Sequence, residues 1–106
     1  MAAAPKLPAS IKVGYRDIAV RLVDTDPETE DRGTFHSALA ELTICGRLLP
    51  ADQVETAIHE ILHACWPSWS MPGDVEECAV SAIAPALAGI WRDNPALIAW
   101  ISHNLA

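Results

Sequence analysis

The stretch from Val54 to Trp66, V-E-T-A-I-H-E-I-L-H-A-C-W, constrains the fold of this chain more than any other segment. It contains two histidines four residues apart, His59 and His63, with Glu60 directly after the first. On an α-helix, side chains at this spacing lie on nearly the same face, about 6 Å apart, so two imidazoles can hold one metal ion. Glu60 lies about 100° further round the helix, so its carboxylate can lie beside the ion.

The H-E-x-x-H pattern predicts the metal-binding helix of a zinc peptidase, in which Glu60 takes a proton from a metal-bound water. The alternative is a helix with two surface histidines and a charged glutamate, because the pattern also occurs by chance. Uncharged neighbours favour the metal helix, since an extra charge inside would perturb a buried site. These neighbours are Ala57, Ile61, Leu62, Ala64 and Cys65.

Two prolines limit this helix in the sequence. Pro50 suits the first helical position, Asp52 in the first turn suits the helix dipole, and Pro67 ends the helix. The side that is expected to face the core carries Val54, Ile58, Ile61, Leu62 and Cys65. The adjoining side, which is expected to face the site, carries Glu55, His59, His63 and Trp66.

The segment before this helix has the alternating pattern of strands. Ile11 to Asp24 predicts one long first strand, with Gly14 as a bulge. Asp24 to Gly33 is acidic and contains proline and glycine, which predicts a loop. Between Thr34 and Cys45 we expect two short strands, with a turn near Ala38, that both pair with the first strand.

The segment after this helix predicts a turn and a second helix. Ser68 to Gly73 forms the turn, Asp74 caps the second helix, and Glu77 completes a capping box with it. We expect Pro85 to kink this helix and Asn94-Pro95 to end it.

These elements predict an α+β fold in a single domain of 106 residues. A small antiparallel or mixed sheet of about three strands would pack on the H-E-x-x-H helix and the second, glutamate-bearing helix. A short C-terminal helix is expected from Ala96 to Asn104. Residues 1–10 contain several alanines and two prolines and predict a flexible N-terminal arm, with the folded domain in residues 11–106.

A catalytic zinc usually has three protein ligands and one position for water, so the two histidines need a partner. The candidates are His36, Asp74, Glu76, Glu77 and His103. Glu76 shares the apolar face of the second helix, where a carboxylate needs a partner such as a metal ion. Because Glu77 is expected in the capping box, the pattern favours Glu76 as the third ligand. The alternative is that both glutamates merely favour the helix N-terminus.

A side chain that stabilises the oxyanion is also expected in such an enzyme. The one tyrosine, Tyr15, and the two spare histidines, His36 and His103, are the candidates. A lone histidine or tyrosine is more often structural, so each is expected first of all to have a structural role. His36, on a strand that is expected near the site, is the first of the three to test.

The segments T-A-I-H-E-I-L-H-A and, on the second helix, E-E-C-A-V resemble the zincin peptidases of the Glu-ligand class. In that class a second helix carries an E-x-x-A pattern whose glutamate is the third ligand, which corresponds to Glu76 here. With K-V-G-Y-R and W-R-D-N-P, the chain from Lys12 onward resembles the very small zincin-like proteins of phages and prophages. The resemblance implies a minimal zincin with a small sheet, the metal helix and the glutamate helix, without the second lobe of larger zincins.

The net charge of −7 and the pI near 4.8 argue against nucleic acid or an anionic membrane surface as a partner. The sequence contains no run of about 18 apolar residues, so it predicts no membrane span. The start of the chain lacks the apolar region of a signal peptide. Three cysteines without a C-x-x-C spacing fit buried, reduced thiols. We therefore expect a cytoplasmic protein, in the host cell cytosol if it is phage-encoded.

The sequence thus predicts a zinc-dependent metallopeptidase that hydrolyses a peptide bond of a peptide or protein substrate. His59, His63 and Glu76 would hold the zinc, and Glu60 would act as the general base. The peptide is expected to add to an exposed strand edge within Thr34 to Cys45. The alternative is a non-catalytic, zinc-stapled protein-interaction module of phage origin. The oligomeric state is left open.

Overall fold

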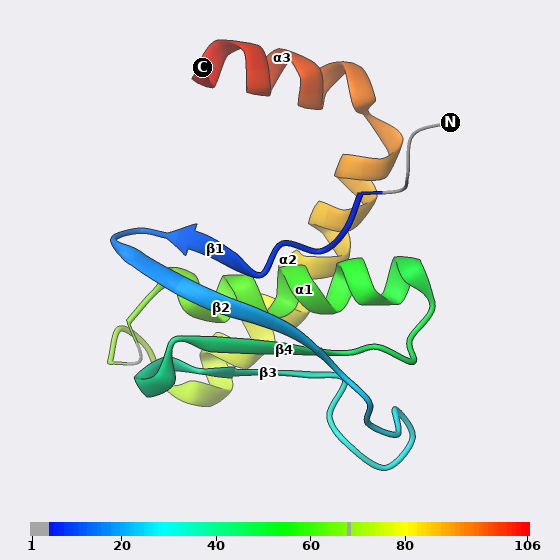
Figure 1. Ribbon diagram of the computed structural model, residues 1–106. Coiled ribbons are helices and arrows are strands. Elements are labelled where there is room, and N and C mark those ends of the chain that lie inside the picture. Colours follow the sequence, from blue (N-terminus) through cyan, green and yellow to red (C-terminus); the bar gives the residue numbers. More distant parts are fainter. Residues whose placement is uncertain (1–4, 68) are drawn as a thin grey trace.

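Four strands and three helices make up the computed structural model, which describes residues 5–67 and 69–106 (Figure 1). The strands are β1 (Ser10–Val13), β2 (Arg16–Val23), β3 (Gly33–His36) and β4 (Glu41–Cys45), and a 3₁₀ turn covers Ser37–Leu39. The helices are α1 (Pro50–Cys65), α2 (Gly73–Asp93) and α3 (Pro95–Leu105). The strands form one mixed sheet in the order β1-β2-β4-β3, with α1 across one face. The α+β prediction is confirmed, with four strands instead of about three.

The N-terminal arm that is predicted for residues 1–10 coincides with the described structure only in part. Residues 1–4 lie outside the described residues. Residues 5–9 belong to no helix or strand, whereas Ser10 already begins β1. The backbone carbonyl of Ala9 accepts a hydrogen bond from the amide of Val20 at 2.9 Å. The arm is therefore attached to β2 at its end.

β1 and β2 form a hairpin, and the prediction of one long strand is wrong. The chain reverses next to Gly14, whose φ of 60° lies in the left-handed region that glycine adopts without strain. Ile11 consequently lies opposite Ile18 in an antiparallel pair. Side chains alternate with the same period in a hairpin and in a single strand, so alternation alone does not reveal the reversal.

β4 lies in the middle of the sheet, parallel to β2 and antiparallel to β3. The expectation that both short strands pair with the first strand is therefore wrong for β3, which is an edge strand. The side chains explain these positions, because Leu42 and Ile44 of β4 are each 1% exposed, whereas β3 has no buried residue. Leu42 and Ile44 form the core with Ile18 and Val20 of β2.

α1 packs on the sheet through a side made of small and apolar residues. Ala57, Ile61 and Ala64 contact the core of the sheet. Two residues of the predicted core side, Val54 and Cys65, are exposed instead, so this part of the prediction is wrong. Alanine side chains let the helix backbone come close to the sheet, and this contact determines which side of α1 faces inward.

The prolines mark the helix ends as predicted. α1 begins at Pro50 and stops two residues before Pro67, and α3 begins at Pro95. α2 passes through Pro85 as one continuous helix. Figure 1 shows that α2 first runs beside α1 and then leaves the sheet, and that α3 turns back above it. None of the described helices is both long enough and apolar enough to span a membrane.

β3 comes very close to α1 at Gly33. A Cβ atom placed on Gly33 would lie 2.6 Å from Cγ2 of Thr56 and 3.2 Å from Cγ of Glu60, both on α1. It would also lie 2.8 Å from the backbone oxygen of Thr43 on the neighbouring strand. Such distances leave no room for a side chain, so the glycine is required for the close approach of strand and helix.

We expect Gly33→Ala to lower the free energy of unfolding by about 1–3 kcal/mol, because the added methyl group overpacks the contact between β3 and α1. Urea denaturation of the purified protein measures this change. Gly73→Ala is the matched control, since a Cβ at Gly73 meets nothing within 4 Å and alanine is the better helix former. An unchanged unfolding free energy for Gly33→Ala would contradict the close approach.

Candidate metal centre

α1 and α2 lie side by side, and their facing side chains bring two histidines and a glutamate together. His59 and His63 come from α1, and Glu77 comes from the first turns of α2. Nε2 of His59 lies 3.0 Å from Oε1 of Glu77, and Nε2 of His63 lies 2.8 Å from Oε2 of the same carboxylate. One ligand atom from each residue lies within 4.8 Å of the other two, so this group could hold a metal ion.

The chemistry of these three side chains fits a divalent ion. Two imidazole nitrogens and one carboxylate oxygen form a ligand set that catalytic zinc sites use, with a fourth position left for water. The side chains of His59 and His63 are only 20% and 17% exposed, whereas that of Glu77 is 54% exposed. The group is therefore fixed on the α1 side and accessible from solvent on the α2 side.

Glu76, the ligand that the sequence favours, lies outside this group. Its Oε2 is 2.5 Å from Nδ1 of His63, the ring nitrogen that does not face Glu77. A carboxylate in this position accepts the Nδ1 proton of His63, so Nε2 is the ring nitrogen that can bind a metal ion on the side of Glu77. The geometry thus fits Glu77 as a ligand and Glu76 as the residue that orients His63.

Glu77 can face α1 because the predicted capping box is absent. α2 begins at Gly73, so Asp74 lies inside the first turn, and no side chain among the described residues caps this helix end. The prediction that Asp74 caps the helix with Glu77 is therefore wrong. Consecutive helix residues point about 100° apart, so the rotation of α2 against α1 decides whether Glu76 or Glu77 meets the histidine Nε2 atoms. The sequence of α2 alone does not define that rotation.

Glu60 lies beside the group, on the side of α1 that faces β3. It is 8% exposed and adjoins Gly33. Because Gly33 has no side chain, β3 packs closely against α1 next to Glu60. Burial raises the pKa of Glu60 above its ordinary value, and nearby carboxylates add to the rise, while positive charge on the two histidines opposes it. A buried carboxylate next to two imidazoles is well placed to accept and release a proton.

The carboxylates around His63 raise its pKa above the ordinary value. Burial by itself lowers this pKa, but the hydrogen bond to Glu76 and the charges of Glu60 and Glu77 outweigh burial. The surroundings of the His63 ring therefore favour positive charge. A divalent cation benefits from the same surplus of negative charge and competes with the proton for the ring nitrogen.

Two clefts meet at Glu60. The first, of about 650 Å³, has a mixed polar and apolar lining that includes the aromatic residues Tyr15, Phe35, Trp66 and Trp69, together with Arg16 and His63. The second, of about 560 Å³, is polar, and its lining includes Asp31, Arg32, Gly33, Thr56, His59 and Glu77. β3 contributes Phe35 to the first cleft and Gly33 to the second. The two clefts therefore lie next to each other along β3, and each is lined by at least one residue of the metal group.

Two residues of the first cleft, Arg16 and Trp69, carry no sequence signal that points to the site. Arg16 follows the β1–β2 turn, and its guanidinium donates hydrogen bonds to the hydroxyl and the backbone carbonyl of Ser37. Trp69 lies between α1 and α2 and is 84% exposed. Both reach the cleft because turns that are far apart in the sequence meet there, and local periodicity does not encode such meetings.

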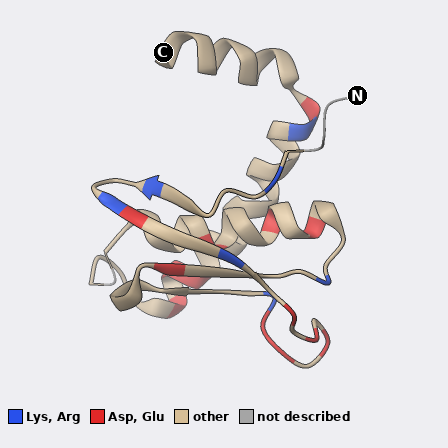
Figure 2. Cartoon of the chain, viewed as in Figure 1, with Lys and Arg blue, Asp and Glu red and all other residues tan. Residues whose placement is uncertain are grey.

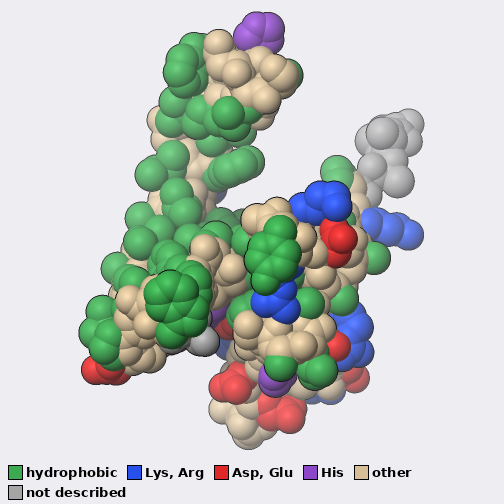
Figure 3. All heavy atoms as spheres, turned by 90° about the vertical axis from the view of Figure 1, so that its left-hand side faces the viewer, with side chains coloured by type: hydrophobic (Ala, Val, Ile, Leu, Met, Phe, Trp, Pro, Cys, Tyr) green, Lys and Arg blue, Asp and Glu red, His purple; other side chains and the backbone are tan. Residues whose placement is uncertain are grey.

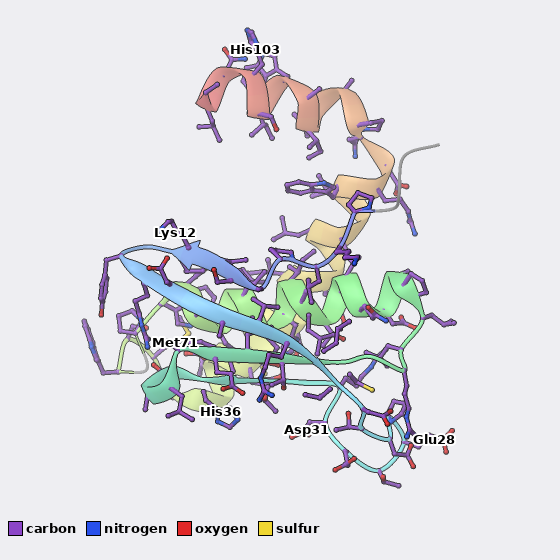
Figure 4. All side chains as sticks on the ribbon, viewed as in Figure 1. Lys12, Glu28, Asp31, His36, Met71 and His103 are labelled. Carbon is purple, nitrogen blue, oxygen red and sulfur yellow. The ribbon has the colours of Figure 1, made fainter. Side chains whose placement is uncertain are left out.

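The three candidates for stabilising an oxyanion lie in different places. His36 is exposed and points away from α1, below β3 in Figure 4. His103 lies on α3, far from the metal group (Figure 4). Tyr15 lines the first cleft, at the β1–β2 turn, and is 97% exposed. Of these three residues, Tyr15 is the one that shares a cleft with Glu60.

The chain matches no protein-family model, no curated protein and no solved structure. Its function is therefore inferred from the geometry of the candidate metal centre.

Proposed function

We propose that this protein is a zinc-dependent metallopeptidase that hydrolyses a peptide bond. The observation that carries the proposal is the convergence of His59 and His63 on the carboxylate of Glu77, with Glu60 buried beside them. A bare H-E-x-x-H pattern occurs by chance. Chance does not explain why the carboxylate of Glu77, on a different helix, contacts the Nε2 atoms of both His59 and His63. The phage or prophage origin that the sequence resemblance implies is part of the same proposal.

The roles of the side chains follow from their positions. His59, His63 and Glu77 would hold the zinc, which when bound activates water and polarises the carbonyl of the scissile bond. Glu60 takes a proton from the attacking water and delivers it to the amine nitrogen as the carbon–nitrogen bond breaks. Glu76 keeps the His63 ring in the orientation in which Nε2 faces the group.

The substrate that we propose is an extended peptide bound along the outer edge of β3. β4 is paired on both sides, so within Thr34 to Cys45 the free edge belongs to β3. An extended peptide can add to such an edge through backbone hydrogen bonds and place its side chains in neighbouring clefts. The aromatic lining around Trp66 and Trp69 suits an apolar or aromatic side chain on that part of the peptide.

The test combines metal content with peptide cleavage. We expect the purified protein to bind about one zinc per chain and to cleave members of an internally quenched peptide library. Removal of zinc with a chelator should abolish cleavage, and stoichiometric zinc should restore it. Mass spectrometry of the cleaved peptides identifies the bond and the preferred residues on either side.

His59→Ala and His63→Ala are the controls for this test. Each removes one of the two imidazoles, so each should lose zinc under conditions in which the wild type keeps it. Full zinc content in either variant would contradict the metal centre. Cleavage that continues at an undiminished rate after complete removal of zinc would contradict the peptidase.

One observation supports an alternative function. The group joins α1 to α2, so a bound zinc would also fasten these two helices together. Zinc would then stabilise a protein-interaction module rather than catalyse a reaction. The two functions differ in what they require of Glu60.

A cytoplasmic location belongs to the same proposal. Cys45, Cys65 and Cys78 form no disulfide, and the two exposed thiols at positions 65 and 78 suit a reducing compartment.

A further inference from the structure

The end of α2 and all of α3 carry a surface that the other described residues, 5–67 and 69–82, do not cover. We call residues 83–105 the C-terminal arm. Figure 1 shows that the end of α2 and all of α3 stand away from the sheet and α1. Ala84, near the start of the arm, is buried, whereas α3 has no buried residue. Figure 3 shows hydrophobic side chains along the column that α2 and α3 form. The exposed large apolar residues of the arm are Ile83, Leu87, Ile90, Trp91, Leu97, Trp100, Ile101 and Leu105.

These side chains recur at helical spacing. Positions 83, 87 and 90 lie on one side of α2, and positions 97, 101 and 105 lie on one side of α3. α2 buries a different pair of residues, Val80 and Ala84, where it packs beside α1. The apolar stripes of the arm are therefore additional to the contacts that hold the fold together, and such stripes are stable when another helix covers them.

The chain exposes more surface than a monomer of its mass. Its accessible surface is 7601 Å², whereas a folded monomer of 11.4 kDa is expected to expose about 5,800 Å². The radius of gyration, 14.6 Å, also exceeds the roughly 13 Å expected for a domain of this length. The excess of about 1,800 Å² lies within the area that each subunit of an obligate homodimer buries, about 1,000–2,500 Å².

The arm is almost free of charge on a strongly acidic chain. From Cys78 to the end of the sequence, only Arg92 and Asp93 are charged among the Asp, Glu, Lys and Arg residues. These two pair with each other at 2.9 Å between Nε and Oδ1. The net charge of −7 therefore comes from the part of the chain before the arm (Figure 2). Two copies can bring their arms together without opposing like charges at the contact.

We propose that the C-terminal arm pairs with the arm of a second copy of this chain, in a two-fold symmetric homodimer. Such an interface is self-complementary, so an uncharged apolar surface meets an identical one. The area that is in excess for a monomer agrees with the area that a stable dimer needs. A membrane surface fits less well, because helices that lie on membranes carry lysine and arginine on their polar face and the arm has a single arginine.

The test is the mass of the full-length protein in solution, measured by sedimentation equilibrium from about 0.1 to 50 μM, a range that covers ordinary dimer affinities. We expect a mass twice the 11.4 kDa of the chain at the upper end of this range. Trp100→Glu should raise the dimer dissociation constant at least about 100-fold, because symmetry places the new charge in the interface twice. The circular dichroism spectrum and zinc content should stay unchanged, since Trp100 is 64% exposed and lies on α3.

Leu39→Glu is the matched control, because Leu39 is a comparably exposed apolar residue outside the arm, at 72% exposure. This variant should remain dimeric. Should Trp100→Glu fail to fold, Leu105→Glu replaces it at the very end of α3, where 82% of the residue is exposed. A monomeric wild type at 50 μM (an upper limit for specific association of this kind) would overturn the proposal. A dimer that both arm variants retain, or a monomer that binds neutral phosphatidylcholine vesicles through the arm, would also overturn it.

Discussion

Glu60→Gln is expected to lower kcat/KM for the best library peptide by about 10²–10⁴-fold, while zinc content and fold persist. The amide has nearly the same shape as the carboxylate, so the close packing of residue 60 against Gly33 is preserved. It cannot accept the proton of the attacking water, and this loss removes the contribution of a general base. The measurement combines steady-state kinetics with zinc analysis and thermal unfolding of the same preparation.

The thermal unfolding of Glu60→Gln has an expected sign of its own. Burial raises the pKa of Glu60, which means that the folded protein disfavours the charged carboxylate at this position. The neutral amide removes that unfavourable term, so the melting temperature of zinc-free Glu60→Gln should be equal to or above that of the zinc-free wild type. Wild-type turnover in this variant would rule out Glu60 as the base. If neither protein cleaves any peptide and both keep zinc, the metal is structural and the stapled module is the better proposal.

The second large effect separates the two neighbouring glutamates of α2. Glu77→Ala should weaken zinc binding by more than about 100-fold, beyond the 10–100-fold loss that is typical when a residue behind a ligand is removed. Glu76→Ala should cause a loss within that smaller range, because Glu76 contacts Nδ1 of His63 and not the group of ligand atoms. Competition with a chromophoric chelator measures both affinities.

Amide substitutions sharpen the comparison of Glu76 and Glu77. Glu76→Gln keeps an oxygen that can accept the Nδ1 proton of His63, so it should recover most of the zinc affinity that Glu76→Ala loses. Glu77→Gln should not recover it, because a neutral amide oxygen is a poor ligand for zinc. The opposite order of effects would make Glu76 the third ligand, as the helix periodicity and the E-x-x-A pattern of the sequence suggest.

The sequence predicts those features that depend on neighbours along the chain. The four-residue spacing of His59 and His63 places both imidazoles on one side of α1, and Pro50 and Pro67 mark the limits of that helix. Helix geometry and the missing amide of proline act within a few residues, so a single sequence contains them. The same holds for the start of α3 at Pro95.

The features that the sequence does not predict depend on contacts between distant elements. The reversal at Gly14, the edge position of β3 and the pairing of Glu77 with the histidines each follow from how whole elements pack together. A register or rotation of this kind changes which residue meets which partner without changing any local pattern. For the candidate site, this is why the two histidines are clear from the sequence while the choice of glutamate is not.

Within the sheet, the parallel pairing of β2 and β4 closes a longer loop than either antiparallel pair does. β1 with β2, β3 with β4, and α1 with α2 are each neighbours in the sequence, so each pair closes a short loop. Joining β2 to β4 is different, because Ala19 must find Glu41 across the acidic loop and β3. The metal group belongs to α1 and α2, which are neighbours in the sequence. Its side chains therefore come together over a short stretch of chain and do not depend on the pairing of β2 with β4.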